Sequence, residues 1–214
     1  MKRILMFLIV MTVATTLTAQ STDGGATTIL QNVSKKYQAY TTMSINYTFK
    51  VEKEKKVLQT MTGTIRIKGA KYAATLGDQE LFCDGKTIWN YQKESQEVSV
   101  FEVDPNDPDN ILNPAKLLSG WSKIYSAKFI REEAQQNKTL QIIDLKPLKQ
   151  ADIYKVRVLI DKNKKELYAI STYEVDNTIS TYYIDKFTAN AAIDDKQFTF
   201  DTSAHPEVDI YDMR

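Results

Sequence analysis

The feature that most constrains this chain is a period-two alternation of apolar and polar residues that returns along most of its length. Residues 45–51, 61–67 and 154–160 show it most clearly. Successive side chains of a strand point to opposite faces of a sheet, so each run predicts a strand with one apolar face. We expect about ten antiparallel strands in all. Further strand patterns lie near 72–76, 79–103, 124–132, 139–145, 167–175, 179–188 and 198–200.

Turn residues separate these runs. Asp84-Gly85 joins two short apolar runs, and glycine accepts the positive φ that a tight turn needs, which predicts a β-hairpin. The connections 161–165 and 176–177 are also typical of hairpins. Residues 104–110 read DPNDPDN, which predicts a loop because proline removes ladder donors. Clustered carboxylates can bind calcium, but this loop lacks the glycine and distal glutamate of an EF-hand, which favours a solvated turn.

An amphipathic helix is expected near the N-terminus, beginning at Thr27. Ile29, Leu30 and Val33 recur at spacings of three and four and continue to Tyr40, which gives one apolar stripe. A helix that follows this pattern can lay its stripe against the apolar face of the sheet.

A second, shorter helix is expected in the middle of the chain. Asn113 and Pro114 are typical of an N-cap and a first helical residue. Leu117 and Leu118 give this helix an apolar side, and Trp121 follows soon after. Both helices are therefore candidates for a cover over the sheet.

A long antiparallel sheet must close on itself or cover its apolar face. We therefore predict a mainly β, α+β fold: a curved antiparallel sheet with a helical lid over a hydrophobic cavity. An ordinary filled core is the alternative that the residues leave open. The candidate lining residues are Tyr47, Phe49, Ile65, Ile67, Trp89, Tyr91 and Phe129, and the candidate lid residues are Ile29, Leu30, Val33, Leu117, Leu118 and Trp121.

The N-terminus is typical of a secretory signal peptide. Lys2 and Arg3 precede the apolar run 4–13, and Ala19 offers a small residue at a cleavage point. We predict a cleaved signal peptide over 1–19 and a single domain over 20–214. Removal of the two basic residues changes the formal net charge of the chain from +1 to −1. Such a near-neutral charge argues against nucleic acid and against electrostatic attachment to anionic lipid.

The sequence offers little for catalysis or metal binding. His205 is the only histidine and Cys83 the only cysteine, and they lie far apart in the chain. One cysteine cannot form an internal disulfide, and a single histidine with a single cysteine argues against a zinc site. We therefore expect no catalytic residue, no metal and no cofactor, and we expect Cys83 to be a buried structural thiol.

Several segments together resemble one family. DGKTIWNY at 84–91 is followed by QEV at 96–98 and NPAKLL at 113–118. Near the C-terminus, Phe198-Thr199-Phe200 and Pro206-Glu207-Val208 complete the pattern. These motifs are similar to those of the LolA family of periplasmic outer-membrane lipoprotein carriers, and the similarity covers nearly all of the chain after residue 19.

The resemblance implies a fold and a function. The fold would be an unclosed β-barrel with a helical lid, in which Trp89 and Tyr91 line the sheet and Leu117 and Leu118 lie on the lid. The protein would be a monomeric periplasmic chaperone and not an enzyme. It would take acylated lipoproteins from an ATP-driven inner-membrane transporter, shield their acyl chains and pass them to an outer-membrane acceptor.

The sequence departs from the family at one place. Gly69-Ala70 stands where the family often has Arg-Pro, and that arginine helps to latch the lid. Either Lys68 or Arg66 would take its role, or the lid would close more weakly. Tyr72 matches an aromatic position that the family uses in transporter contact, so it is a candidate partner-contact residue.

Two other functions fit the same fold, because a fold does not determine function. One is a shuttle or sensor that binds a lipid or glycolipid. The other is an exported interaction protein with a filled core. Identification of a bound species would distinguish these alternatives.

Overall fold

The computed structural model describes residues 23–103, 120–135 and 137–214. Within these residues it contains one α-helix, α1 (Gly24–Gln38), and three short 3-10 helices, η1 (Trp121–Lys123), η2 (Asp195–Phe198) and η3 (Thr202–Ala204). The rest of the regular structure is strand. The strands are β1 (Thr42–Lys53), β2 (Lys56–Lys68), β3 (Lys71–Leu76), β4 (Gln79–Cys83), β5 (Thr87–Gln92), β6 (Glu97–Glu102), β7 (Tyr125–Gln135), β8 (Lys138–Pro147), β9 (Ile153–Asp161), β10 (Glu166–Glu174), β11 (Thr178–Ala189) and β12 (Asp209–Asp212).

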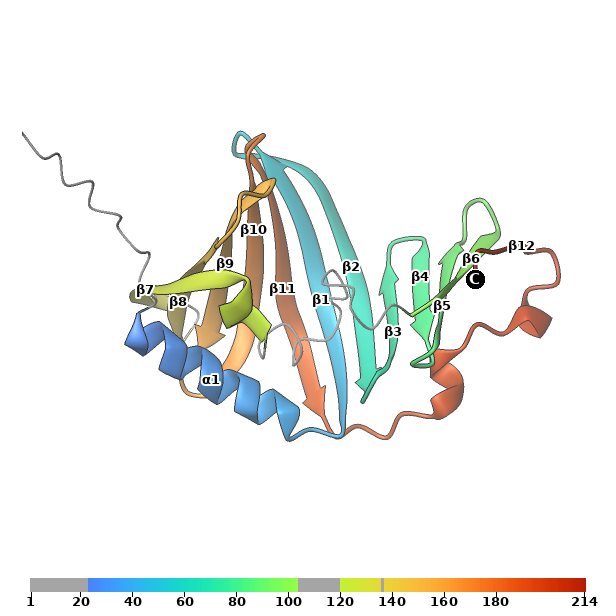
Figure 1. The fold of residues 1–214 in the computed structure, drawn as a ribbon, viewed down its shortest axis with the longest axis horizontal. Helices are drawn as coiled ribbons and strands as arrows, with labels where there is room; N and C mark the ends of the chain where they lie inside the picture. The colour runs from blue at the N-terminus through green and yellow to red at the C-terminus, as the bar shows by residue number, and fades with distance from the viewer. Residues whose placement is uncertain (1–22, 104–119, 136) are drawn as a thin grey trace, which may run out of the picture.

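All twelve strands belong to one sheet. Their order is β12-β6-β5-β4-β3-β2-β1-β11-β10-β9-β8-β7, so β7 and β12 are the two edges and the sheet does not close on itself. Neighbouring strands are antiparallel except β12, which runs parallel to β6. Figure 1 shows the long strands β1, β2, β10 and β11 in the middle and the shorter strands β3 to β6 to one side. The predicted mainly β fold, an unclosed β-barrel with a helix, is confirmed.

The predicted hairpin at Asp84-Gly85 is also confirmed. Gly85 has φ +98°, a conformation that favours glycine. The Asp84 carboxylate accepts hydrogen bonds from the backbone amides of Lys86 and Thr87, both at 2.8 Å. This Asx-type turn joins β4 to β5.

Helix α1 begins earlier than predicted. Asp23 is its N-cap, and the Asp23 side chain accepts a hydrogen bond from the amide of Gly25 at 2.8 Å. The Asp23 amide also donates to the carbonyl of Ala127 in β7 at 2.9 Å. Asp23, four residues before the predicted start at Thr27, therefore attaches the start of the helix to an edge strand.

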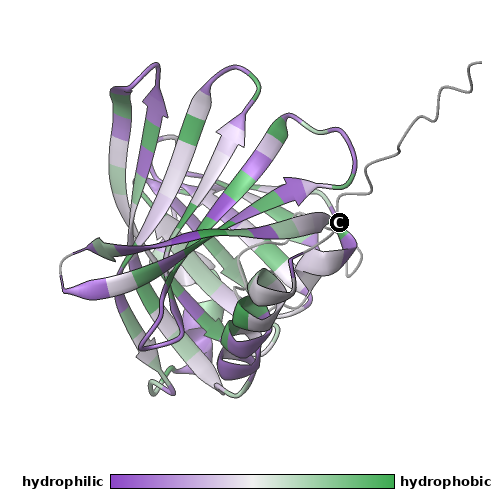
Figure 2. Cartoon of the chain, turned by 90° about the vertical axis from the view of Figure 1, so that its left-hand side faces the viewer, coloured by the Kyte–Doolittle hydropathy of each residue, from purple (hydrophilic) through white to green (hydrophobic). Residues whose placement is uncertain are grey.

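The sheet curves around α1. Leu30 and Val33 of the helix share one core cluster with Cys83 of β4 and with Ile143 of β8, although six strands lie between β4 and β8 in the sheet. A single face can bring such distant strands together only if it is concave. Figures 1 and 2 show α1 lying across this concave face, and Figure 2 shows the alternation of hydropathy along the strands.

The C-terminal segment corrects one prediction. Residues 198–200 do not form a strand, because Phe198 ends η2 and is fully buried while Phe200 packs against Tyr91 with ring centroids 5.0 Å apart. The last strand is instead β12, which no sequence pattern predicted.

Several predictions lie outside the described residues. These are the signal peptide, the 104–110 loop and the second helix with Leu117 and Leu118. In the part of the chain that is described, no helix is both long enough and apolar enough to span a membrane.

Candidate functional site on the concave face

One part of the concave face depends on a close approach between neighbouring strands. Tyr47 of β1 lies directly opposite Gly63 of β2, and its ring crosses the glycine to reach β3. There the Tyr47 hydroxyl donates a hydrogen bond to the carbonyl of Thr75 at 2.9 Å. A side chain at position 63 would collide with the Tyr47 ring and with the Thr75 carbonyl. Burial raises the pKa of the Tyr47 hydroxyl to about 12.

Tyr47 belongs to a group of three aromatic residues that we call the aromatic patch: Tyr47, Phe49 and Tyr182. Tyr182 of β11 lies opposite Phe49, with ring centroids 4.6 Å apart, and its ring lies 5.7 Å from that of Tyr47. Although Tyr47 is buried, Tyr182 keeps 36% of its surface exposed and Phe49 is half-buried. Large aromatic side chains therefore remain accessible on the concave face.

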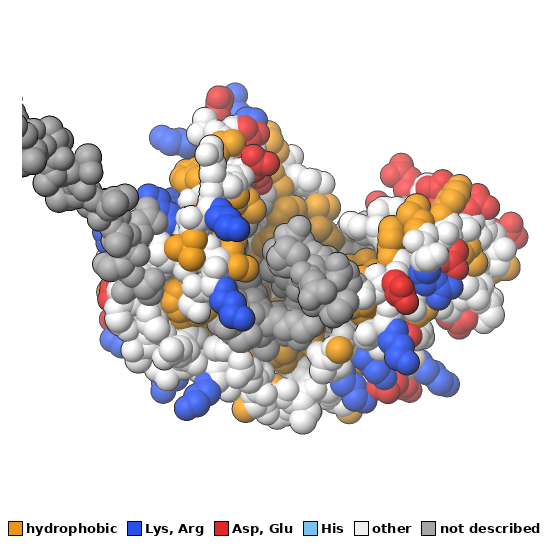
Figure 3. Space-filling view, in the orientation of Figure 1, with side chains coloured by type: hydrophobic (Ala, Val, Ile, Leu, Met, Phe, Trp, Pro, Cys, Tyr) orange, Lys and Arg blue, Asp and Glu red, His pale blue; other side chains and the backbone are white. Residues whose placement is uncertain are grey.

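Aliphatic residues continue this exposed surface across the neighbouring strands. Ile170 of β10 pairs with Tyr182, and Ile184 follows Tyr182 on the same face of β11. Both isoleucines are only partly buried. Figure 3 shows hydrophobic side chains between the side that carries α1 and the side that carries β3 to β6. The concave face thus has an apolar part that α1 does not fill.

Helix α1 is fixed at its C-terminal end as well as at Asp23. The Lys36 ammonium lies 2.7 Å from the Glu166 carboxylate at the start of β10. The buried Tyr37 hydroxyl accepts a hydrogen bond from the amide of Leu167 at 3.1 Å, and burial raises the pKa of Tyr37 well above its ordinary value. Both ends of the helix are therefore attached to the sheet.

The residues near Gly69-Ala70 that were expected to hold the lid make other contacts. Lys68 and Lys71 both contact the Asp195 carboxylate of η2, at 2.6 Å and 2.7 Å, and these bonds lower the pKa of Asp195 to about 2. Arg66 makes no ion pair with any residue that the structure describes. Lys68 therefore fastens the C-terminal segment to the sheet and does not hold α1.

The structure brings most of the predicted lining and lid residues together around the core beneath α1. The buried members of this core cluster include Leu30, Val33, Ile67 and Trp121. Ile29, Ile65 and Phe129 are partly buried against it. Because Trp121 is buried beside the helix, it forms part of the wall of the concave face.

Two predicted lining residues lie elsewhere. Trp89 and Tyr91 belong to a separate group, the outer cluster, and the structure does not bring them together with Tyr47. Cys83 pairs with Ile88, and both face the concave core, so the adjacent Trp89 points to the opposite face. The sequence showed the alternation correctly but not which face was concave. The outer cluster consists of Phe82, Trp89, Tyr91, Val98, Phe200 and Val208.

Tyr72 is also placed differently from the expectation of a partner contact. Only 5% of its surface is exposed, and it packs in the core cluster beneath α1. Contact with a partner would require this part of the core to open. In the structure as it stands, Tyr72 is a core residue.

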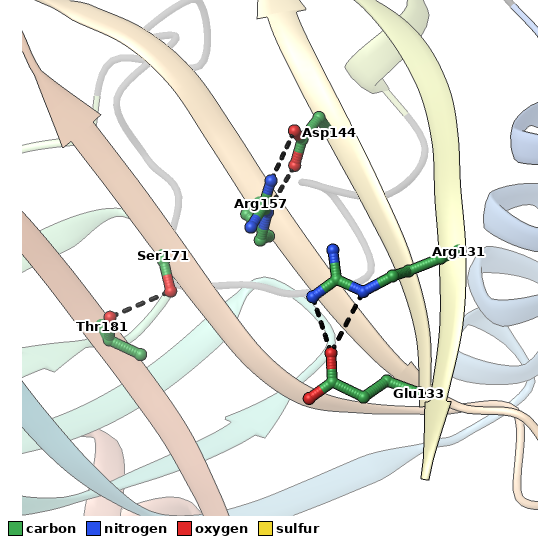
Figure 4. A network of polar contacts seen from close by, with 6 residues as sticks. All are labelled: Arg131, Glu133, Asp144, Arg157, Ser171 and Thr181. Atoms are coloured by element: carbon green, nitrogen blue, oxygen red, sulfur yellow. Dashed lines mark hydrogen bonds and ion pairs between the residues drawn. The ribbon is translucent and has the colours of Figure 1, made fainter. Parts of the chain in front are cut away.

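The outer face of β8 to β11 carries paired polar groups. Arg157 binds Asp144 through two hydrogen bonds of 2.6 Å and 2.8 Å, which raise the pKa of the Arg157 guanidinium. The buried Thr181 hydroxyl donates to Ser171 at 2.9 Å (Figure 4). This polar pairing distinguishes the outer face of these strands from their apolar concave side.

Sequence reasoning missed Tyr182, Ile170 and Ile184 as members of the site. A signal was present, because Tyr182 and Ile184 alternate with other residues in the strand pattern at 179–188. Their place beside Phe49 depends on β1 pairing with β11, and these strands lie far apart in the chain. No local pattern specifies that pairing.

The geometry defines an unclosed, curved sheet with a helix across its concave face and an exposed apolar surface beside the helix. Residues 38–201 match the family profile described as "Outer membrane lipoprotein carrier protein LolA". The match covers more than half of the chain, and the chain therefore belongs to the LolA family. No curated protein sequence matches the chain.

Solved structures support the fold. An uncharacterized conserved protein from Thermus thermophilus is similar with a TM-score of 0.60 and 8% identity, over 88% of this chain and 99% of that one. The lipoprotein LppX from Mycobacterium tuberculosis is similar with a TM-score of 0.51 and 12% identity, over 81% and 99% of the two chains. At such low identities the similarity shows the fold alone.

Proposed function

We propose that this protein is a carrier that binds the acyl chains of lipoproteins on its concave face and moves them from the inner to the outer membrane. One observation carries this proposal: Phe49, Tyr182 and Ile170 lie together on the concave face and remain partly exposed beside a filled core. An exposed apolar surface of this kind is typical of an interaction or ligand site. Membership of the LolA family supports a lipoprotein as the ligand.

The surface suits an acyl chain because it has no charged side chain among its members. Removal of a chain of about 15 methylenes from water is worth on the order of 10 kcal/mol. Part of that free energy is offset by the lost freedom of the bound chain. Binding therefore needs no specific polar contact, and different lipoproteins can share one site.

In this proposal, helix α1 forms one side of the binding surface. Its side chains Leu30 and Val33 fill one part of the concave face, and Trp121 completes that wall. The attachments at Asp23 and Lys36 favour a helix that stays in place while cargo enters beside it. The roles proposed for Leu117 and Leu118 as lid residues, and for Tyr72 as a partner contact, rest on the family resemblance.

The partners and the location follow the same proposal. An ATP-driven inner-membrane transporter would load the carrier, and an outer-membrane acceptor would receive the cargo. The carrier would act in the periplasm after removal of residues 1–19, as a monomer that is not itself lipidated. Its mechanism would be binding and release, with no covalent chemistry.

Native mass spectrometry of the protein purified from its own host, followed by extraction of bound species, tests this proposal. We expect a complex with an intact acylated lipoprotein. Free lipid or glycolipid without a protein would instead support a lipid shuttle or sensor. A protein that is empty and also fails to bind an acyl-chain fluorophore would contradict the proposal and favour a filled-core interaction protein.

A further inference from the structure

Charge is divided unevenly between two parts of this molecule. Residues 76–103 and 194–214 together carry twelve Asp and Glu against four Lys and Arg, a net charge of −8. The other described residues carry 21 Lys and Arg against twelve Asp and Glu, a net charge of +9. Because β4, β5, β6 and β12 are neighbours in the sheet, the negative charges gather at one end. Figure 3 shows the red Asp and Glu side chains concentrated where Figure 1 places β6 and β12.

The edge strand β12 and the residue that follows it expose apolar side chains within this acidic end. Ile210 is 53% exposed, Tyr211 47% and Met213 60%. No ion pair with another described residue neutralises Glu207 or Asp209, which lie beside them. Exposed apolar side chains bordered by unpaired charges of one sign are typical of a surface that meets a partner of the opposite sign.

The backbone of β12 is also available on one side. Asp209 donates its amide to the carbonyl of Gln96, and Met213 donates to the carbonyl of Val100, both at 2.9 Å. Since alternate residues of a strand face the same neighbour, the amides of Ile210 and Asp212 point away from β6. Within the described ranges β12 pairs with β6 alone, so these groups form a free sheet edge.

The acidic residues around β12 affect the Tyr211 side chain. The Tyr211 hydroxyl lies 3.5 Å from the Glu97 carboxylate. The negative charges of Glu97 and then Asp209 raise the pKa of Tyr211, because they disfavour a phenolate beside them. An approaching ammonium or guanidinium would meet the opposite, favourable effect.

We propose that β12 is a docking edge for a protein partner that adds an extended, lysine- or arginine-rich segment to the sheet. The free amides would give the strand pairing, Ile210, Tyr211 and Met213 would give apolar contact, and the acidic residues would select a basic partner. An anionic membrane would be repelled by the same charges. This edge lies outside the aromatic patch, so the inference does not depend on lipid binding.

The probe for this proposal is a fluorescein-labelled eight-residue peptide in which lysine alternates with threonine and valine. A matched peptide carries glutamate in place of each lysine. We expect the lysine peptide to bind more tightly by fluorescence anisotropy, with an affinity that falls as salt rises. Hydrogen exchange of the wild-type protein should show new protection at Ile210 and Asp212. Equal binding of the two peptides, or no protection at these amides, would overturn the proposal.

Two sets of variants locate the binding surface. Glu207→Lys with Asp209→Lys should weaken binding of the lysine peptide by about tenfold or more. Glu54→Lys with Asp152→Lys makes the same charge change on the other part of the molecule and should leave binding within about twofold. Equal losses in both sets would contradict the proposed edge.

Other occupants are separate outcomes of the same experiment. Sedimentation of the wild-type protein with vesicles rich in phosphatidylglycerol, together with new protection of the Ile210 and Asp212 amides in the vesicle-bound protein, would assign the edge to a membrane and overturn the proposal. Self-association that Glu207→Lys with Asp209→Lys abolishes would assign it to a second copy of this chain, which also overturns the proposal. Binding of an acyl-chain fluorophore should be unchanged in these variants, so failure here is distinguishable from failure of the carrier function.

Discussion

The concave face has two parts that differ in what covers them. Beneath α1, Leu30 and Val33 are almost fully buried and the space is filled by the helix of the chain itself. On the middle strands, Phe49 and Tyr182 lie on the same face of the sheet but keep part of their surface exposed. Among the described residues, the same curvature therefore supports a filled core in one part and an apolar surface that stays partly exposed in the other.

The difference shows how a protein can keep an exposed apolar surface without losing its stability. The filled part supplies the burial that stabilises the fold, and the open part can remain accessible to a ligand. Under the proposed function, substitutions should separate the two parts: changes beneath α1 should affect unfolding, and changes at Phe49 and Tyr182, the exposed members of the aromatic patch, should affect binding.

The largest expected effect on stability lies in the filled part. Leu30→Ala removes buried methyl and methylene groups and leaves a cavity, so it should lower the free energy of unfolding by about 2–5 kcal/mol. Urea unfolding measures this value. Gln31→Ala, at an exposed position of the same helix, should change it by less than about 0.5 kcal/mol. A loss from Leu30→Ala no larger than that of the control would contradict a filled core.

A smaller loss of stability is expected where the Tyr47 ring of the aromatic patch crosses Gly63. Gly63→Ala places a methyl group against the Tyr47 ring and the Thr75 carbonyl, and it should destabilise the protein by about 1–3 kcal/mol. Gly120→Ala is the matched control, because the added methyl group would meet no atom within 4 Å. Thermal unfolding of both variants tests this close approach, and two equal midpoints would contradict it.

Tyr47→Phe tests the Tyr47 hydrogen bond through its dependence on pH. The substitution removes a hydrogen bond to Thr75 and should cost about 1 kcal/mol at pH 8. The pKa of Tyr47 is raised in the folded state to about 12, so its contribution is present below the ordinary tyrosine pKa of about 10 and is lost as pH rises through 12. The variant should therefore lose less stability between pH 8 and pH 11. Identical losses in the variant and the wild type, by urea unfolding at the two pH values, would argue against a perturbed Tyr47.

The smallest effect on stability is expected outside both parts of the concave face. Asp195→Asn removes the contacts with Lys68 and Lys71, which are exposed ion pairs, so the urea midpoint should not change measurably. Hydrogen exchange at β12 should become faster, because these contacts fasten the C-terminal segment. Since the pKa of Asp195 is lowered to about 2, the wild type keeps this fastening at neutral pH and loses it only as pH falls through that value. Unchanged exchange in the variant would show that the contacts do not hold the segment.

The sequence predicted most strands of this fold because each strand carries its own alternation. The turn at Asp84-Gly85 was predictable for the same reason, since its chemistry is local. Local patterns could not decide which face of β5 is concave, so Trp89 and Tyr91 were grouped with the wrong face. That decision depends on curvature, which is set by pairing between strands far apart in the chain, such as β1 with β11.

The start of α1 was missed although a signal existed. Asp23 is a typical N-cap residue, but the two glycines after it are poor helix formers and lie before the first apolar residues of the stripe. The β12 strand was missed because four exposed residues at a sheet edge carry no apolar alternation toward a core. Short elements that depend on long-range pairing have the weakest local signal.

The most direct test of the carrier account is a titration of an acyl-chain fluorophore into two variants of adjacent tyrosines. Tyr182→Asp places a charge in the aromatic patch, whereas Tyr183→Asp places it on the opposite face of the same strand. We expect Tyr182→Asp to weaken binding by about tenfold or more, because a charge beside an apolar ligand is costly, while Tyr183→Asp should bind nearly as tightly as the wild type. Equal affinities in two folded variants would contradict the claim that acyl chains bind on the open part of the concave face.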